Sequence, residues 1–283
     1  YVDYSYATDG ITGSDVDHTT IDHLSINGNL ALAARGIYFT SGDSLTITNN
    51  YIDVDGAEGI YANNAAYSDI SSNTIITPSY GIRAYDCDYC SINENNINSD
   101  DGVEGPNYGI SADQSSEIKV LNNSIVADDH GIYVPTSFKA TINNNRITGA
   151  FQDNGIDVQN SDSSTIRENY IKRTWYNGYV YDWDYLINAN HSEGSTIVRD
   201  TLLTSNWNHS RWDHQMTIRC EWSRVDSNYI EVYFRRYNDH YAIYDERNSN
   251  ISHNTIIVSS YTNNETNHII RSESTDSYVN SIN

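Results

Sequence analysis

Lysine is scarce in this chain. Only Lys119, Lys139 and Lys172 occur among 283 residues, and 38 acidic residues outnumber 16 basic ones. The resulting net charge of −22 repels nucleic acid and anionic lipid, so we expect neither as a partner. A surface this acidic suits high salt or a cell exterior, and we predict an extracellular or cell-surface protein. A polyanionic ligand would need a local arginine cluster or bound cations.

Cysteines and long apolar runs are also few. Three cysteines do not make a disulfide framework. Cys87 and Cys90 occupy repeat positions where sibling copies carry Ser115 and Ala140, so we interpret both cysteines as small buried residues. Cys220 lies next to an inward strand position and has the same interpretation. No apolar run approaches the roughly 20 residues of a transmembrane helix, which predicts no membrane span. Because the first residue is Tyr1, we expect a mature or trimmed piece whose targeting signal is not readable.

A short phrase returns along the chain: an apolar residue, two polar residues, an asparagine, one further residue and an isoleucine. Its copies occupy 47–52, 70–75, 92–97, 120–125, 142–147, 166–171, 225–230 and 251–256, and a variant with Asp200 occupies 197–202. A second phrase, Gly-Ile-x, begins at Gly36, Gly59, Gly81, Gly109, Gly131 and Gly155. The resulting period of about 22 to 28 residues is typical of a solenoid.

The period indicates which solenoid this is. Runs of three to five residues carry apolar positions two apart, such as Ile132 and Val134, which is strand alternation and too short for helices. Three short strands per repeat predict an all-β protein, a single-stranded parallel β-helix of about ten turns. Asparagine suits the recurrent polar position because it tolerates a left-handed bend and its amide can bond the asparagine of the next turn.

Over roughly Ile21 to Ser277, these repeats resemble the right-handed parallel β-helix shared by pectate-lyase-like and polygalacturonase-like carbohydrate enzymes, NosD-like proteins and viral tailspikes. The resemblance implies a right-handed coil with a polysaccharide groove on the Gly-Ile-x strand. The bias toward Asn, Ile, Tyr and Asp also looks like archaeal surface proteins, including the disaggregatase of methanogens. We predict one elongated domain over 1–283, with residues 1–20 as an N-terminal cap or lead-in.

The composition changes after Ile171. All five tryptophans lie within 175–222, while the repeat continues beneath them. Three excursions, 172–185, 203–216 and 231–241, leave the same corner of adjacent turns. Loops stacked at one corner build one wall, so we predict that the elaborated region 172–241 forms the functional site.

Strand alternation turns the x of each Gly-Ile-x outward, and equivalent positions in successive turns stack about 4.8 Å apart. The predicted ladder is Tyr38, Tyr61, Arg83, Ser111, Tyr133, Asp157, Asn188, Arg219, Tyr244 and Arg271. A neighbouring ladder, two residues on, is Thr40, Asn63, Tyr85, Asp113, Pro135, Gln159, Asn190, Glu221, Glu246 and Glu273. Aromatic faces, arginines and carboxylates in one strip suit a glycan groove.

We predict four catalytic candidates on these ladders: Glu221, Glu246, Asp157 and Arg219. Glu221 and Glu246 would lie one turn apart, near the roughly 5 Å of retaining glycosidases, and Asp157 about two turns from Glu221, near the inverting separation. Arg219 could hold a substrate carboxylate or, as in the lyases that this fold resembles, act near an abstracted proton. Each acid has the alternative interpretation of a solvated surface group.

The predicted substrate-binding residues come from the ladders and the excursions: Tyr133, His130, Asn188, Tyr244, Trp183, Trp207, Trp212, Arg211, Arg235, His214 and Asp184. His130 lies in the segment Asp128-Asp129-His130-Gly131, which resembles the paired aspartates before a strand in polygalacturonases. Two further segments of that family, Gly-His-Gly and Arg-Ile-Lys, are missing here. No His-x-x-x-His or paired C-x-x-C motif occurs, so we expect no cofactor, although aspartate clusters could bind Ca²⁺ as in pectate lyases.

The favoured interpretation is a glycoside hydrolase acting on an acidic or amino-sugar polymer, ahead of a lyase because carboxylates are plentiful and lysine is scarce. A viral tailspike or adhesin would use the same groove for binding without cleavage. We expect a monomer for the enzyme and a trimer for a tailspike. A structural surface-layer or NosD-like protein would leave the tryptophan-rich excursions unexplained.

Overall fold

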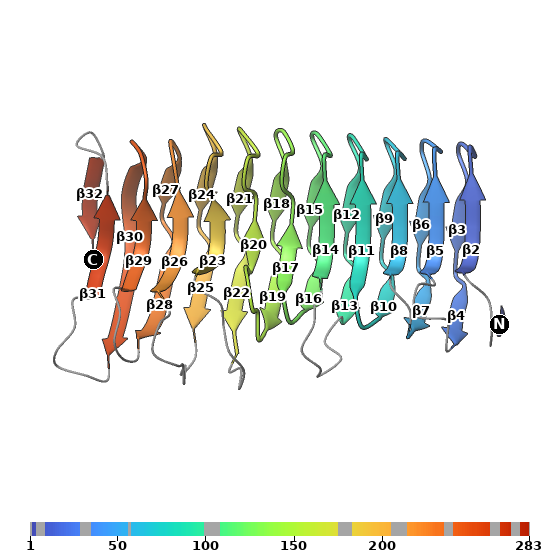
Figure 1. Ribbon diagram of the computed structural model, residues 1–283, viewed down its shortest axis with the longest axis horizontal. Helices are drawn as coiled ribbons and strands as arrows, with labels where there is room; N and C mark the ends of the chain where they lie inside the picture. The colour runs from blue at the N-terminus through green and yellow to red at the C-terminus, as the bar shows by residue number, and fades with distance from the viewer. Residues whose placement is uncertain are drawn as a thin grey trace.

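The computed structural model describes residues 2–3, 9–28, 35–55, 58–98, 108–174, 183–204, 214–234, 240–260, 267–272 and 278–282. These residues form a coil of short strands that stack side by side from one end of the molecule to the other (Figure 1). All strand pairs are parallel, which confirms the predicted all-β parallel β-helix. No helix of the described residues is long and apolar enough to cross a membrane.

Each turn supplies one strand to each of three stacks. The first stack, here called the groove sheet, comprises β2 (Asp9–Ser14), β5 (Arg35–Thr40), β8 (Glu58–Asn63), β11 (Tyr80–Tyr85), β14 (Tyr108–Asp113), β17 (His130–Tyr133), β20 (Ile156–Asp157), β23 (Trp183–Ala189), β26 (His214–Cys220), β29 (His240–Asp245) and β31 (Asn267–Ser272). It therefore has eleven strands, a small difference from the predicted ten turns. Its first strand, β2, lies inside the predicted lead-in segment 1–20.

The other two stacks complete each turn. The second comprises β3 (Thr20–Asp22), β6 (Thr46–Thr48), β9 (Asp69–Ser71), β12 (Ser91–Asn93), β15 (Lys119–Leu121), β18 (Thr141–Asn143), β21 (Thr165–Arg167), β24 (Thr196–Val198), β27 (Arg224–Asp226), β30 (Asn250–Ser260) and β32 (Tyr278–Ile282). The third comprises β1 (Val2–Asp3), β4 (Ser25–Gly28), β7 (Tyr51–Val54), β10 (Thr74–Ile76), β13 (Asn96–Asn98), β16 (Ser124–Val126), β19 (Arg146–Gly149), β22 (Tyr170–Arg173), β25 (Thr201–Thr204) and β28 (Tyr229–Phe234). The long strand β30 pairs in both and joins them.

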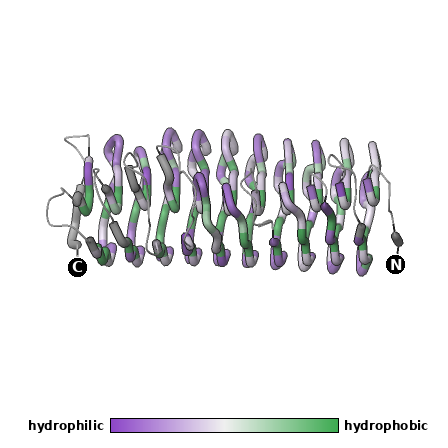
Figure 2. Tube along the Cα trace, turned by 60° about the horizontal axis from the view of Figure 1, so that its bottom comes forward, coloured by the Kyte–Doolittle hydropathy of each residue, from purple (hydrophilic) through white to green (hydrophobic). Residues whose placement is uncertain are grey.

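The core is a column of isoleucines. One turn contributes Ile82 from β11, Ile92 from β12 and Ile97 from β13, and all three are fully buried. The same hydrophobic positions recur in turn after turn along the tube (Figure 2). Ala84, Cys87 and Cys90 are buried in the same turn, so small residues complete the narrow column and the hydrophobic content stays modest at 38%.

The glycine of each Gly-Ile phrase lies at a corner where the third strand of one turn gives way to the groove sheet. A Cβ added at Gly109 would lie 2.3 Å from Cγ2 of Ile125 and 2.5 Å from the carbonyl oxygen of Gly131. Gly36, Gly59, Gly81, Gly131 and Gly155 show the same close approach. The glycine is therefore required by packing between successive turns.

We expect Gly109→Ala to destabilise the protein by about 1–3 kcal/mol, because the core isoleucine and the next backbone must both shift. Thermal unfolding of the variant beside Ser124→Ala, a change at an exposed position of β16, measures the effect. An unchanged melting temperature for Gly109→Ala would contradict the packing argument.

The recurrent asparagines form a buried ladder, as predicted. Oδ1 of Asn73 accepts from the backbone N–H and from Nδ2 of Asn50, both at 3.0 Å, and Nδ2 of Asn73 donates to Oδ1 of Asn95 at 3.0 Å. Its other hydrogen bond goes to the carbonyl of Ile47 at 2.8 Å. One detail of the prediction is wrong. The left-handed residue is the one before each ladder asparagine, such as Ser72 with φ 56°, so the asparagine is selected for its amide.

The interpretation of the cysteines as buried residues is confirmed. Cys87, Cys90 and Cys220 are free thiols without solvent exposure. Sγ of Cys87 lies 3.3 Å from the carbonyl oxygen of Ala62, and Sγ of Cys90 lies 3.0 Å from that of Ala65. They fill the position that serine fills in neighbouring turns, where Oγ of Ser115 accepts from the backbone of Cys87.

Candidate functional site

The groove sheet carries the first predicted ladder in register. Tyr133 pairs with Asp157, Asp157 with Asn188, and Asn188 with Arg219. The register continues toward both ends through Tyr38, Tyr61, Arg83, Ser111, Tyr244 and Arg271. The alignment of all ten positions is thus confirmed.

A further row of outward residues precedes this ladder. It consists of the residues just before each Gly-Ile, and includes Tyr80, Tyr108 and His130 in register, followed by Asn154. Tyr185 continues the row, before Leu186-Ile187, where leucine replaces the glycine. Both Gly and Ile are buried at the corner, as in β11, so the outward positions there are three residues apart. Alternation of inward and outward residues, counted from Gly-Ile-x, places the residue before the glycine on the inside, so it did not predict this row. The glycine at the corner marks the place where two successive residues are buried and the alternation shifts.

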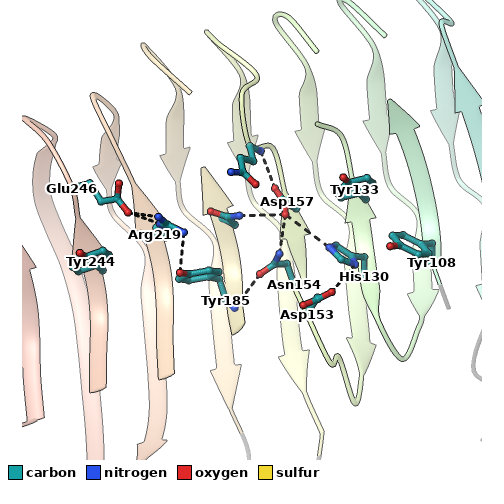
Figure 3. Close-up of a pocket in the computed structure, with 12 residues that line it drawn as sticks. Tyr108, His130, Tyr133, Asp153, Asn154, Asp157, Tyr185, Arg219, Tyr244 and Glu246 are labelled. Carbon is teal, nitrogen blue, oxygen red and sulfur yellow. Dashed lines mark hydrogen bonds and ion pairs between the residues drawn. The ribbon is translucent and has the colours of Figure 1, made fainter. Parts of the chain in front are cut away.

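Where the two rows meet, side chains from β14 to β29 surround a cavity of about 590 Å³. Its walls are Tyr108, His130, Tyr133, Asp153, Asn154, Asp157, Gln159, Tyr185, Asn188, Arg219, Tyr244 and Glu246. Figure 3 shows His130 and Tyr108 on one side of Asp157, and Arg219, Tyr244 and Glu246 on the other.

Asp157 lies at the centre of the cavity and is only 4% exposed. Oδ2 accepts from Nδ2 of Asn154 at 2.8 Å and from Nδ2 of Asn188 at 3.2 Å, and Oδ1 accepts the N–H of Gln159 at 2.8 Å. These donors favour the carboxylate, but burial outweighs them and raises the pKa of Asp157. The side chain is therefore fixed in direction, and its protonated form costs less than that of a solvated aspartate.

His130 stands beside Asp157 in an aromatic stack. Its ring lies 4.8 Å from the ring of Tyr108 at an interplanar angle of 8°, and Tyr80 continues the stack at 4.6 Å from Tyr108. Tyr133 meets His130 edge-on at 4.8 Å. Burial raises the pKa of Tyr108 and of Tyr133, and nearby carboxylates add to the effect. Both phenols therefore stay neutral and present flat faces and hydroxyls to the cavity.

Three carboxylates surround the imidazole of His130. Nε2 lies 3.9 Å from Oδ2 of Asp157, and Nδ1 lies 3.5 Å from Oδ2 of Asp129 and 3.8 Å from Oδ2 of Asp153. Burial raises the pKa of Asp153, and the neighbouring Asp129 carboxylate adds to the rise. This end of the cavity is strongly anionic.

The opposite end holds the cation of the cavity. Nε of Arg219 donates to Oε1 of Glu246 at 2.6 Å, and Nη2 also contacts that oxygen. Nη1 of Arg219 donates to Oη of Tyr185 at 3.1 Å. Tyr185 is itself held in place, because its backbone N–H donates to Oδ1 of Asn154 at 3.0 Å. A guanidinium, a carboxylate and a phenol thus face Asp157 across the cavity.

A comparison of the sequence with protein families agrees with the parallel β-helix seen in the structure. The sequence family described as "Right handed beta helix region" matches residues 9–171 and 108–281. The chain belongs to the right-handed β-helix family. No curated protein sequence matches it.

Solved structures of other right-handed β-helix proteins are similar in fold. A surface adhesin of Streptococcus pneumoniae, PfbA, has a TM-score of 0.54 at 12% identity over 88% of this chain and 70% of that chain. The A-module of the mannuronan C-5 epimerase AlgE6 of Azotobacter vinelandii has 0.54 at 11% over 93% and 64%. A tailspike mutant of E. coli bacteriophage HK620 in complex with pentasaccharide has 0.57 at 12% over 96% and 58%.

This β-helix chain therefore spans between 58% and 70% of the length of those three proteins. Identities this low show a shared fold.

The cavity brings together seven of the predicted site residues. They are Asp157, Arg219, Glu246, Tyr133, His130, Asn188 and Tyr244. Tyr108, Asp153, Asn154 and Tyr185 belong to the same cavity and were missed. Asp153 follows a corner loop and had no repeat phrase to mark it.

Glu221 does not line this cavity. It is 4% exposed, and its carboxylate accepts the N–H of His191 at 3.3 Å and lies 3.4 Å from Nε of Arg247. Side chains from the turns on either side cover it. The geometry supports Glu221 as a structural anchor, and its catalytic role stays a prediction without support from the cavity.

The predicted aromatic wall falls largely outside the described residues. Trp207, Trp212, Arg211 and Arg235 all lie there. Trp183 and Asp184 lie in β23, and His214 lies in β26 opposite Trp183, but only their backbone positions are described. These seven substrate-binding assignments remain predictions.

Two trios of side chains could hold a metal ion among the described residues. One is Asp129, His130 and Asp153, and the other is His191, Glu221 and Glu246, with the candidate ligand atoms of each trio within 4.8 Å of one another. In the second trio, Glu221 and Glu246 already contact Arg247 and Arg219. Beside the first trio, Nη2 of Arg173 donates to the backbone carbonyl of Asp153 at 2.8 Å, and the charge of Arg173 opposes the rise in the pKa of Asp153.

Proposed function

We propose that this protein binds an acidic polysaccharide in the cavity over β14 to β29 and hydrolyses it there. One observation carries the proposal. A buried, hydrogen-bonded carboxyl, Asp157, faces the Arg219–Glu246 pair across a cavity that aromatic rings line. Two carboxyl groups in different environments, with room between them for a sugar, are the requirement of glycoside hydrolysis.

Asp157 is the proton donor in this proposal. Burial favours its neutral form, and Asn154 and Asn188 fix the direction of the carboxyl group. A group held in this way can protonate a glycosidic oxygen that enters the cavity above it. Its immobility matters because proton transfer requires a hydrogen bond of about 2.6–3.2 Å to the leaving oxygen.

Glu246 is the second carboxylate. The guanidinium of Arg219 lies two strands along the groove sheet from Asp157, through β23 to β26, which is about 9–10 Å at strand spacing. Glu246 contacts that guanidinium at 2.6 Å. Glu246 directly follows β29, three strands from Asp157, which is about 14 Å at strand spacing and exceeds the roughly 6.5–9.5 Å separation of inverting enzymes. The proposal therefore requires Glu246 to leave Arg219 and approach Asp157 when substrate binds. The pair Asp157 and Glu246 replaces the predicted pairs that contain Glu221.

An acidic substrate follows from the charge distribution. On a chain of net charge −22, a polyanion needs a local cation, and among the described residues Arg219 is the arginine that lines this cavity. A uronate carboxylate can take the bidentate position on the guanidinium that Glu246 now holds. Glu246 is then free to activate the attacking water.

One contact favours a second candidate, β-elimination. The hydroxyl of Tyr185 accepts from Nη1 of Arg219, so a phenol stands beside the cation that would hold the uronate. That arrangement suits removal of the proton next to the substrate carboxylate. A lyase would leave an unsaturated product that absorbs ultraviolet light, and a hydrolase would not.

Incubation with a panel of uronate-containing, sulfated and amino-sugar polymers tests the proposal. We expect new reducing ends from an acidic polymer without new ultraviolet absorbance. Absorbance rising with the reducing ends would establish the lyase. Binding without cleavage of any polymer would contradict the enzyme proposal and favour the adhesin or tailspike alternative, for which sedimentation would show a trimer.

Three broader assignments keep the status of predictions. They are an extracellular or cell-surface location, a monomeric state, and similarity to the disaggregatase of methanogens. The surface adhesin and the tailspike with bound pentasaccharide share the fold at 12% identity, which supports looking for the protein outside the cell.

A further inference from the structure

The segment Asp128-Asp129-His130-Gly131 lines the cavity and also forms, with Asp153, a cluster of an imidazole and two carboxylates. Asp129 and Asp153 occupy equivalent positions of successive turns, because the N–H of Asp153 donates to the carbonyl of Asp129 at 3.4 Å. Their carboxylates therefore stack on the same side of the coil. Nδ1 of His130 faces both, at 3.5 Å from Asp129 and 3.8 Å from Asp153.

That nitrogen lacks a hydrogen-bond partner among the described residues. The side chain of His130 is 7% exposed, so bulk water does not solvate the nitrogen freely. Burying an imidazole nitrogen without a partner costs free energy, and two neighbouring carboxylates repel each other. The guanidinium of Arg173 lies beside the Asp153 backbone rather than between the groups, so a cation placed between Nδ1 and the two carboxylates would relieve both costs.

We propose that Asp129, His130 and Asp153 bind a divalent first-row transition-metal ion, Zn²⁺ or Mn²⁺. Ligands at about 2.0–2.2 Å from a tetrahedral ion lie roughly 3.3–3.6 Å apart, close to the two distances from Nδ1. One imidazole with two carboxylates suits such an ion better than Ca²⁺, which takes six to eight oxygens. Nε2, the other ring nitrogen, points toward Asp157, as a metal-bound histidine points its free N–H toward a carboxylate.

Three protein ligands leave coordination positions open. Asp153 and His130 both line the cavity, so an open position faces the space where the proposed polysaccharide lies. The ion supplies a second positive charge at the anionic end of the cavity, opposite Arg219, and would bind a sugar carboxylate or hydroxyl there. This role of the ion rests on the proposed function, whereas binding of the ion itself does not.

Calorimetric titration of the full chain with Zn²⁺, Mn²⁺ and Ca²⁺, after removal of metal with a chelator, tests the site without any sugar. Asp129→Asn and Asp153→Asn keep the side-chain shape and remove the charges. The matched control is His191→Ala, in the trio whose carboxylates contact arginines. Thermal unfolding of each variant reports whether it is folded.

We expect one ion of Zn²⁺ or Mn²⁺ per chain, with affinity reduced about 100-fold or more by Asp129→Asn and by Asp153→Asn and unchanged by His191→Ala. Absence of binding at millimolar Zn²⁺ and Mn²⁺ would overturn the proposal. Tight Ca²⁺ binding without Zn²⁺ or Mn²⁺ would overturn the choice of metal. Metal binding by a chain that cleaves no polymer would overturn the proposed function and leave the site standing.

Discussion

Asp200→Asn is expected to stabilise the protein at neutral and alkaline pH by on the order of 2–4 kcal/mol. Asp200 is the one aspartate in the described asparagine ladder, and it is 1% exposed. Oδ1 accepts the N–H and Nδ2 of Asn169 at 2.7 and 2.9 Å, as an asparagine oxygen would. Oδ2 occupies the place of an amide nitrogen and lacks a hydrogen-bond partner among the described residues.

Burial raises the pKa of Asp200 to about 7. Because the folded pKa lies above the unfolded value, the native state binds more protons than the unfolded state between these two values. The stabilising effect of the proton is complete below about pH 4 and is lost as the pH rises toward about 7, at up to about 1.4 kcal/mol per pH unit. An asparagine has no such loss and restores the missing donor.

Melting temperatures of wild type and Asp200→Asn, measured from pH 4 to pH 8, check this prediction. The two curves should separate as the pH rises, with the variant more stable. The reverse change, Asn145→Asp, places the same defect in a fully amidated part of the ladder and should lower the melting temperature at pH 8. Equal pH dependence for wild type and Asp200→Asn would show that Asp200 carries no proton.

Asp157→Asn is expected to lower kcat on the polymer that wild type cleaves by about 10²–10⁴-fold. An amide keeps the size of the side chain but has no proton to transfer to the leaving oxygen. Arg219 stays in place, so KM should change by less than about tenfold. Initial rates from reducing-end release measure both constants.

Asp53→Asn is the matched control, since Asp53 lies on β7, in the third stack, and its carboxylate accepts from Tyr51. It should keep the wild-type rate. If Asp157→Asn also keeps it, Asp157 is a structural group and the hydrolytic proposal loses its proton donor. If instead kcat survives while KM rises strongly, Asp157 binds substrate without transferring a proton.

The fold was predictable because the repeat restricts it at every turn. A corner glycine such as Gly109 and a ladder asparagine such as Asn73 recur at a period that only a coil of three short strands accommodates. The register of Tyr133, Asp157 and Asn188 follows from counting, since each turn stacks directly on the last.

The candidate site was only partly predictable because it depends on contacts between turns. Alternation fails at the corner, where Gly and Ile are both buried, and this hid Tyr185 and Asn154. Glu221 occupies the same outward-facing position of its turn as Glu246, yet His191 and Arg247 from neighbouring turns cover it. Such coverage depends on side chains from adjacent turns, and the alternation of residues along one strand does not predict it.

The central claim is that the cavity around Asp157 and Arg219 holds the polysaccharide. A crystal structure of Asp157→Asn with an oligosaccharide of the polymer that wild type cleaves tests it most directly. The account predicts a sugar carboxylate on the guanidinium of Arg219 and a glycosidic oxygen beside residue 157. An oligosaccharide bound only elsewhere on the coil, with the cavity free of sugar, would contradict it.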